Sequence, residues 1–127
     1  IYFTIRRFFR NGFSETMHEM RIHRQLCENK VMLTHIVCWK YMPETDTSMR
    51  DDHRGRLRAL VGKIPEIVEF NVGEDILHLE RSFDTGLVST FADREALDAY
   101  TVHPEHQAVA AFGKEISERV VSVDFLT

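Results

Sequence analysis

The residues best suited to chemistry stand together at positions 100–106, in the run Tyr-Thr-Val-His-Pro-Glu-His. A histidine can exchange a proton near neutral pH, and a tyrosine hydroxyl beside it can donate a hydrogen bond to an oxygen that gains negative charge. The run therefore indicates an acid–base site formed by Tyr100 and His106. A second interpretation stays open, in which Tyr100 and His103 cap helix ends and Pro104 shapes a helix junction.

The same run raises the question of a metal site. His103 and His106 lie three positions apart, and Glu105 or His35 could complete a set of ligands. A pair of histidines at this spacing is common, however, and the chain offers no stronger metal motif. We therefore expect neither a metal nor a cofactor.

Other histidines lie outside this run. His35 falls in an alternating segment, on the face that also carries Trp39, and it gains interest only if the fold brings it to His106. His53 and His78 stand among polar residues. We expect both to be exposed to solvent.

The elements that must position these residues follow the order β-α-β-β-α-β. Alternating residues predict strands, and apolar residues at helical spacing together with capping residues predict helices. This order indicates an α+β fold of the ferredoxin-like type, a four-stranded antiparallel sheet with helices on one face. The predicted strands cover residues 32–42, 66–72, 83–91 and 120–125, and the predicted helices cover residues 46–63, 93–100 and 104–117.

This arrangement leaves the second face of the sheet without a cover. An open sheet of this size commonly finds that cover in a second copy of itself, so we expect a homodimer. Leu33, Val37 and Leu87 predict that the open face is apolar. A two-fold interface would pair identical patches of the two copies.

The composition fits one globular domain and excludes several functions. The chain has 127 residues, of which 43% are hydrophobic and 28% are charged. Its net charge is −4 although residues 1–31 are basic, so the remainder is acidic and lacks the positive stripe that nucleic-acid binding needs. The chain contains no run of about 18 apolar residues, so its sequence predicts no membrane span. Cys27 and Cys38 match no metal spacing, and we interpret them as free thiols of a cytoplasmic protein.

The composition changes near Met32. We divide the chain there into an N-terminal extension, residues 1–31, and a domain, residues 32–127. Residues 14–30 are compatible with a helix. Three origins of the extension stay open: a targeting segment, sequence upstream of a natural start at Met32, or an appendage that packs on the domain.

Residues 32–126 resemble the stress-responsive A/B barrel (Dabb) family of the dimeric α/β-barrel superfamily. Glu66 departs from the glycine that the family often has after Ile-Pro. The resemblance implies two ferredoxin-like subunits whose sheets pack face to face into a dimeric α/β barrel. It is carried by Leu-Thr-His-Ile-Val at 33–37, Lys-Ile-Pro at 63–65, Val-Gly at 72–73, Ser-Phe-Asp-Thr-Gly-Leu-Val-Ser-Thr-Phe at 82–91, Ala-Leu-Asp-Ala-Tyr-Thr-Val-His-Pro-Glu-His at 96–106 and Val-Asp-Phe at 123–125.

The resemblance leaves the activity open. Most relatives have no assigned function, and some plant relatives are stress-induced, stable assemblies. One plant relative is a polyketide cyclase that closes a ring by aldol condensation. Its acid–base pair corresponds to Tyr100 and His106 here, and its first-strand histidine, which matches His35, lines the same pocket.

Two functions from different classes follow from these observations. In the first, a dimer binds a small organic molecule in a cavity between sheet and helices, where His106 takes a proton and Tyr100 holds the enolate oxygen. We expect Trp39, Phe83, Phe91 and His103 to contact that molecule. In the second, the protein is a non-catalytic structural or stress-protective dimer. A monooxygenase-like activity is a third and weaker option, since no haem ligand stands out.

Overall fold

The computed structural model describes residue 17 and residues 31–127. The predictions for the N-terminal extension, its helix at 14–30 and Cys27 therefore concern residues that lie, apart from Met17 and Val31, outside the described part. No helix within the described part is long and apolar enough to cross a membrane.

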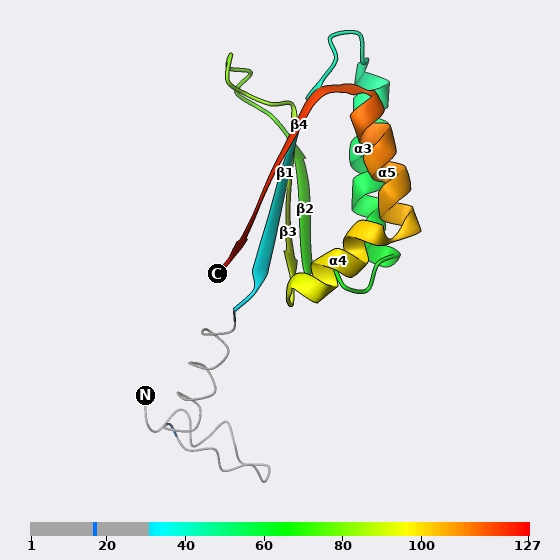
Figure 1. Cartoon of the computed structure of the whole chain (residues 1–127). Helices are drawn as coiled ribbons and strands as arrows, with labels where there is room; N and C mark the ends of the chain where they lie inside the picture. The colour runs from blue at the N-terminus through cyan, green and yellow to red at the C-terminus, as the bar shows by residue number, and fades with distance from the viewer. Residues whose placement is uncertain (1–16, 18–30) are drawn as a thin grey trace, which may run out of the picture. The chain divides into compact units, whose positions relative to one another are not determined.

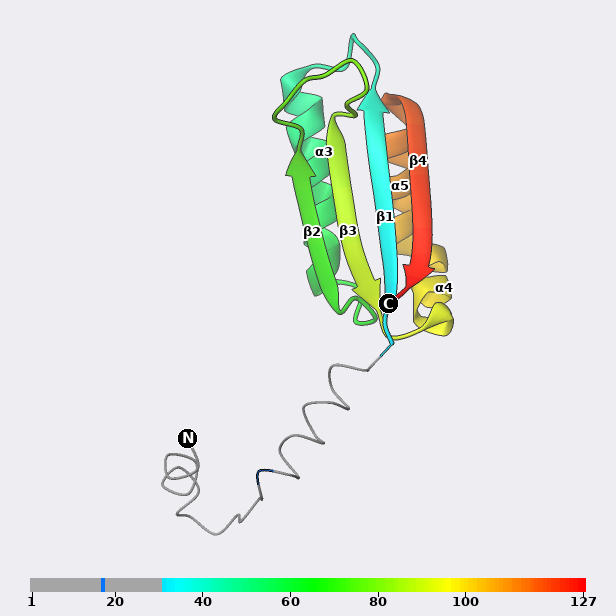
Figure 2. The ribbon, with the colours of Figure 1, turned by 90° about the vertical axis from the view of Figure 1, so that its left-hand side faces the viewer.

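From Leu33 onward the chain forms an antiparallel sheet with helices on one face, which confirms the predicted ferredoxin-like α+β fold (Figure 1). Figure 2 looks onto the opposite face of this sheet, which no helix of the described part covers. The strands stand in the order β2-β3-β1-β4, so β1 pairs with a neighbour on each side. The elements are β1 (Leu33–Tyr41), α3 (Thr47–Ala59), the 3₁₀ helix η1 (Leu60–Gly62), β2 (Glu69–Glu74), β3 (Thr85–Phe91), α4 (Arg94–Val102), α5 (Pro104–Glu115) and β4 (Ser117–Leu126).

Capping side chains start the helices where the sequence places them. The carboxylate of Asp46 accepts from the backbone N–H of Met49 at the start of α3, and Asp93 does the same for Ala96 in α4, each at 2.8 Å. The start of the last strand differs from the prediction. β4 begins at Ser117 rather than at residue 120, because β1 offers pairing partners as far as Tyr41.

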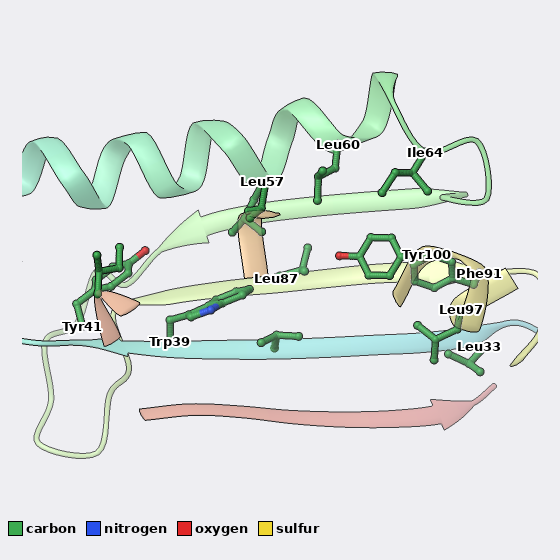
Figure 3. Close-up of a cluster of buried hydrophobic side chains, with 13 residues drawn as sticks. Leu33, Trp39, Tyr41, Leu57, Leu60, Ile64, Leu87, Phe91, Leu97 and Tyr100 are labelled. Atoms are coloured by element: carbon green, nitrogen blue, oxygen red, sulfur yellow. The ribbon is translucent and has the colours of Figure 1, made fainter. Parts of the chain in front are cut away.

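The core lies between the helices and the face of the sheet that turns toward them (Figure 3). Successive side chains of a strand point to opposite faces. Leu33, Val37 and Leu87 belong to the helix-covered face and are buried. The prediction that these three residues line the open face was therefore wrong. Both faces of β1 carry apolar residues, so the strand pattern does not reveal which face the helices cover.

The open face is nonetheless apolar, through a different set of residues. The register places Val88 and Val123 beside Ile36, which lies on the opposite face of β1 from Val37. Val88, Val121, Val123 and Phe125 are all exposed there. The expectation of an apolar open face holds, with these residues in place of the predicted ones.

His53 is buried, contrary to the expectation that it is exposed. It lies four residues before Leu57 on α3, so both side chains share the face that packs on the sheet. The Tyr41 hydroxyl donates to Thr85 at 2.8 Å and lies 2.8 Å from Nδ1 of His53, which therefore donates its own proton to the phenol oxygen. Burial, together with Arg54 and Arg56, lowers the pKa of His53 to about 4, so the ring is neutral at pH 7.

Gly113 of α5 lies directly against this buried ring. A Cβ atom at position 113 would lie 2.5 Å from Nε2 of His53 and 3.0 Å from Nε1 of Trp39. The missing side chain lets α5 pack closely over His53. The contrasting position is Gly55 of α3, where a Cβ atom would meet nothing within 4 Å.

We predict that Gly113→Ala lowers the free energy of unfolding by about 1–3 kcal/mol, since the added methyl group has no room. Gly55→Ala should raise it by about 0.5–1 kcal/mol, because alanine costs less backbone entropy in an open helical position. Urea unfolding of both variants measures the difference. A Gly113→Ala protein as stable as the wild type would contradict the close packing of α5 on His53.

Candidate functional site

A cavity of about 570 Å³ lies between the sheet and the helices. Its floor is the helix-covered face of β1 with parts of β3 and β4, and its walls come from α3, α4 and α5. This volume exceeds the ~300 Å³ at the lower end of small-molecule sites. It is lined by His35, Val37, Trp39, Leu57, Leu87, Tyr100, Thr101, His106, Ala110, Lys114, Ser117, Glu118, Arg119, Val120 and Ser122.

Three side chains that the sequence singled out meet in the wall of this cavity. The rings of Tyr100 and His106 lie 4.2 Å apart between centroids, and the ring of His35 lies 6.1 Å from that of Tyr100. Tyr100 ends the buried face of α4, while His106 stands in the first turn of α5. The break between the two helices at His103 and Pro104 turns the chain, so both rings face the same space. Their catalytic roles remain predictions.

The surroundings of His106 define its protonation. Its Nδ1 lies 3.0 Å from the carbonyl oxygen of Thr101, which can only accept, so Nδ1 carries the hydrogen. In the neutral ring Nε2 then holds the free lone pair. Burial lowers the pKa of His106, with smaller contributions from His35 and His103, while the Thr101 carbonyl offsets part of the shift. The ring is therefore a neutral potential base at pH 7.

The hydroxyl of Tyr100 is protonated, which complements the neutral ring of His106. Burial raises the pKa of its hydroxyl far above the ordinary value, because the charged form would lose its hydration. The phenol therefore keeps its proton and can act as a hydrogen-bond donor. Figure 3 shows its oxygen pointing along the core in the direction of Leu87.

His35 has a partner in Asp124, a residue outside the predicted site. The carboxylate of Asp124 accepts a hydrogen bond from Nδ1 of His35, across the register pair of β1 and β4. This contact uses only Nδ1 of His35, so the other ring nitrogen, Nε2, takes no part in it. A further hollow of about 490 Å³ is lined by both residues and by Thr101, which also lines the main cavity. The sequence signal for Asp124 is a carboxylate in the mostly apolar run of residues 120–126.

The residues expected to contact a ligand fall into different places. Trp39 lines the cavity as expected. Phe91 is fully buried and does not line the cavity. Its ring lies 4.9 Å from the ring of Tyr100, so Phe91 supports the Tyr100 ring instead. His103 caps α5 by accepting from the backbone N–H of Glu105 at 3.1 Å and does not line the cavity.

Phe83 was also placed wrongly. It precedes β3 and lines a separate hollow of about 580 Å³, with Cys38 and Val88 of the open sheet face. The predicted strand 83–91 put Phe83 in alternation with Phe91. The observed β3 begins only at Thr85, so the alternation does not extend back to Phe83. No group of three or more potential metal ligands occurs among the residues that the structure describes.

Comparison with known proteins identifies the family. The model of the stress-responsive A/B barrel domain matches residues 33–127. The chain belongs to this family. No curated protein matches the chain.

Solved structures of the same fold include dimeric proteins. A dimeric ferredoxin-like protein of unknown function from a Jannaschia species is 28% identical, with a TM-score of 0.64 over 74% of this chain and 97% of that one. A dimeric protein of unknown function from Bacteroides fragilis is 26% identical, with a TM-score of 0.66 over 74% and 94%. A hydroxynitrile lyase from Passiflora edulis is 19% identical, with a TM-score of 0.70 over 76% and 93%, and shows a common fold alone.

The contact of His106 with Thr101 and the burial of its ring predict the tautomer and the titration midpoint of His106 in the folded protein. Nitrogen-15 NMR at pH 7 should show a neutral ring with its hydrogen on Nδ1. The midpoint of its titration should lie below the ordinary value of 6.5, because burial disfavours the charged ring. A midpoint at or above ~6.5, or a hydrogen on Nε2, would remove His106 as the base of this cavity.

Proposed function

We propose that this protein is a homodimer that binds a small, largely apolar carbonyl compound in the cavity and removes a proton from the carbon next to the carbonyl group. The observation that carries the proposal is the meeting of a neutral imidazole and a protonated phenol in the wall of one sizeable cavity. General acid–base catalysis needs this pair of protonation states at neutral pH.

The step balances within the site. Nε2 of His106 accepts the proton, and the electrons of the broken C–H bond form the carbon–carbon double bond of an enolate. The negative charge moves to the former carbonyl oxygen, where the Tyr100 hydroxyl stabilises it with a hydrogen bond. The enolate carbon can then attack a second carbonyl group, which is the aldol type of ring closure or condensation. His35, oriented by Asp124, offers a second imidazole at the same end of the cavity.

The cavity also limits the substrate. It extends along β1 from His35 to Trp39, which is about 13 Å at ~3.3 Å per residue. Val37, Leu57 and Leu87 form its middle, so a substrate needs an apolar body beyond the reacting carbonyl. A hydroxynitrile lyase with this fold supports the view that such a scaffold can carry an active site.

We predict that the protein exchanges the methyl protons of acetophenone for deuterium in D₂O faster than buffer alone. His106→Asn should lower the enzymatic rate by about 10²–10⁴-fold, since the proton acceptor is lost, and Tyr100→Phe should lower it as well. Proton NMR follows the methyl signal. The matched control is His103→Asn, which keeps a good helix cap outside the cavity and should change the rate far less than His106→Asn does.

The alternative is a non-catalytic, stress-protective dimer, and the same assay separates the two. Wild-type protein that exchanges no faster than buffer, or a His106→Asn variant as active as His103→Asn, would contradict acid–base catalysis at this joint. Unfolding of each variant by urea shows that a lost rate does not reflect a lost fold.

The dimer rests on the open face of the sheet. Valines and Phe125 expose an apolar surface there, and related solved structures are dimeric. A second copy that packs the same face against this one would form an isologous interface and complete the barrel. Large obligate interfaces of this kind bury upwards of ~2,000 Å².

We predict that Val123→Asp dissociates this dimer, because two carboxylates would be buried in the apolar interface. The matched control is Val61→Asp in η1, whose valine is 53% exposed against 52% for Val123 but does not lie on the open face. Sedimentation at micromolar concentration measures both variants. A folded wild-type monomer, or a Val123→Asp protein that remains dimeric, would contradict the proposed interface.

A further inference from the structure

The loop between β2 and β3, residues 75–84, exposes more apolar surface than loops normally do. Surface loops are enriched in glycine, proline, asparagine, aspartate and serine. This loop instead presents Ile76 and Leu77 with 83% and 66% of their surface exposed, followed by Leu79. Ile76 and Leu77, with Leu79 beyond His78, form an exposed apolar patch of the kind that marks interaction sites.

Hydrogen bonds hold the loop in one conformation. At its base, the N–H of Asp75 donates to the carbonyl of Asp84 at 2.9 Å. The Asp75 carboxylate accepts from the N–H of His78 at 2.7 Å, and the Ser82 hydroxyl accepts from the N–H of Leu79 at 3.1 Å. His78 adopts the left-handed backbone conformation, with a φ of 52°, which is uncommon for a residue other than glycine. The apolar side chains are thus presented on an ordered loop, which reduces the entropy lost on binding.

Further contacts tie the loop to the first strand. The Asp84 carboxylate accepts from the N–H of Tyr41 at 2.8 Å, and Nζ of Lys40 donates to the carbonyl of Ser82 at 3.1 Å. Arg50 of α3 adds an ion pair with Asp84. These contacts fix the position of the loop relative to the end of the sheet.

The direction of the loop identifies what it meets. Figures 1 and 2 show it bending away from the helices, toward the face of the sheet that the helices leave uncovered. The hollow lined by Asp75, Phe83 and Val88 lies at its base on that same face. A partner that covers the open face would therefore also contact this loop.

We propose that this loop is a dimerisation arm, whose Ile76 and Leu77 pack on the second copy of this chain beyond the edge of the sheet interface. The inference rests on the dimer proposed above. Because a two-fold interface is isologous, each subunit contributes one arm and each substitution removes two contacts.

The test measures the dissociation constant of the dimer by sedimentation. Leu77→Ser should raise it at least about tenfold, which corresponds to about 1.4 kcal/mol, and Ile76→Ser combined with Leu77→Ser should raise it further. The matched control is Val102→Ser at the end of α4, where the valine is 65% exposed but remote from the open face. This control should keep the wild-type dissociation constant.

The outcomes separate this inference from the proposed sheet interface. If Val123→Asp dissociates the dimer while the double variant keeps the wild-type constant, the arm is wrong and the sheet interface stands. If the wild type sediments as a monomer, both proposals fall. Far-UV circular dichroism and urea unfolding of the variants confirm that they fold, and the single variant Ile76→Ser gives an independent measurement if the double variant does not.

Discussion

The alternation of side chains along β1 is the constraint on which the rest of the structure depends. β1 is an inner strand with a neighbour on each side, so its residues can face only the helices or the open side. His35, Val37 and Trp39 point toward the helices and line the cavity. Ile36 and its neighbours in register form the opposite, apolar surface. A shift of one residue in the pairing would exchange these two sets and remove both the cavity and the proposed interface.

The junction of α4 and α5 combines a structural and a chemical role in different residues. His103 has an extended backbone before Pro104 and caps the following helix, so it fixes the corner. Tyr100 and His106 lie on either side of that corner, and their rings meet at 4.2 Å in the wall of the cavity. The two interpretations of this run are therefore not exclusive, since capping falls to His103 while the cavity belongs to Tyr100 and His106.

A buried and a half-buried histidine show why a lowered pKa alone does not identify a reactive group. Burial lowers the pKa of both His53 and His106, and both donate through Nδ1. Nε2 of His53 faces Gly113 at a distance that leaves no room even for a methyl group. His106 instead lines a cavity of about 570 Å³. Accessible space, rather than protonation, distinguishes the structural histidine from the candidate base.

The sequence by itself determined the order of the elements and the helix break at His103 and Pro104, because alternation, capping and proline act within a few residues. Its motifs also carried the resemblance to the family. Only the tertiary structure decided which face of β1 the helices cover, since both faces are apolar. It also buried His53, and it moved Phe83 out of the expected cavity. Asp124 meets His35 through strand pairing across 89 positions of the chain, and no local pattern encodes such a contact.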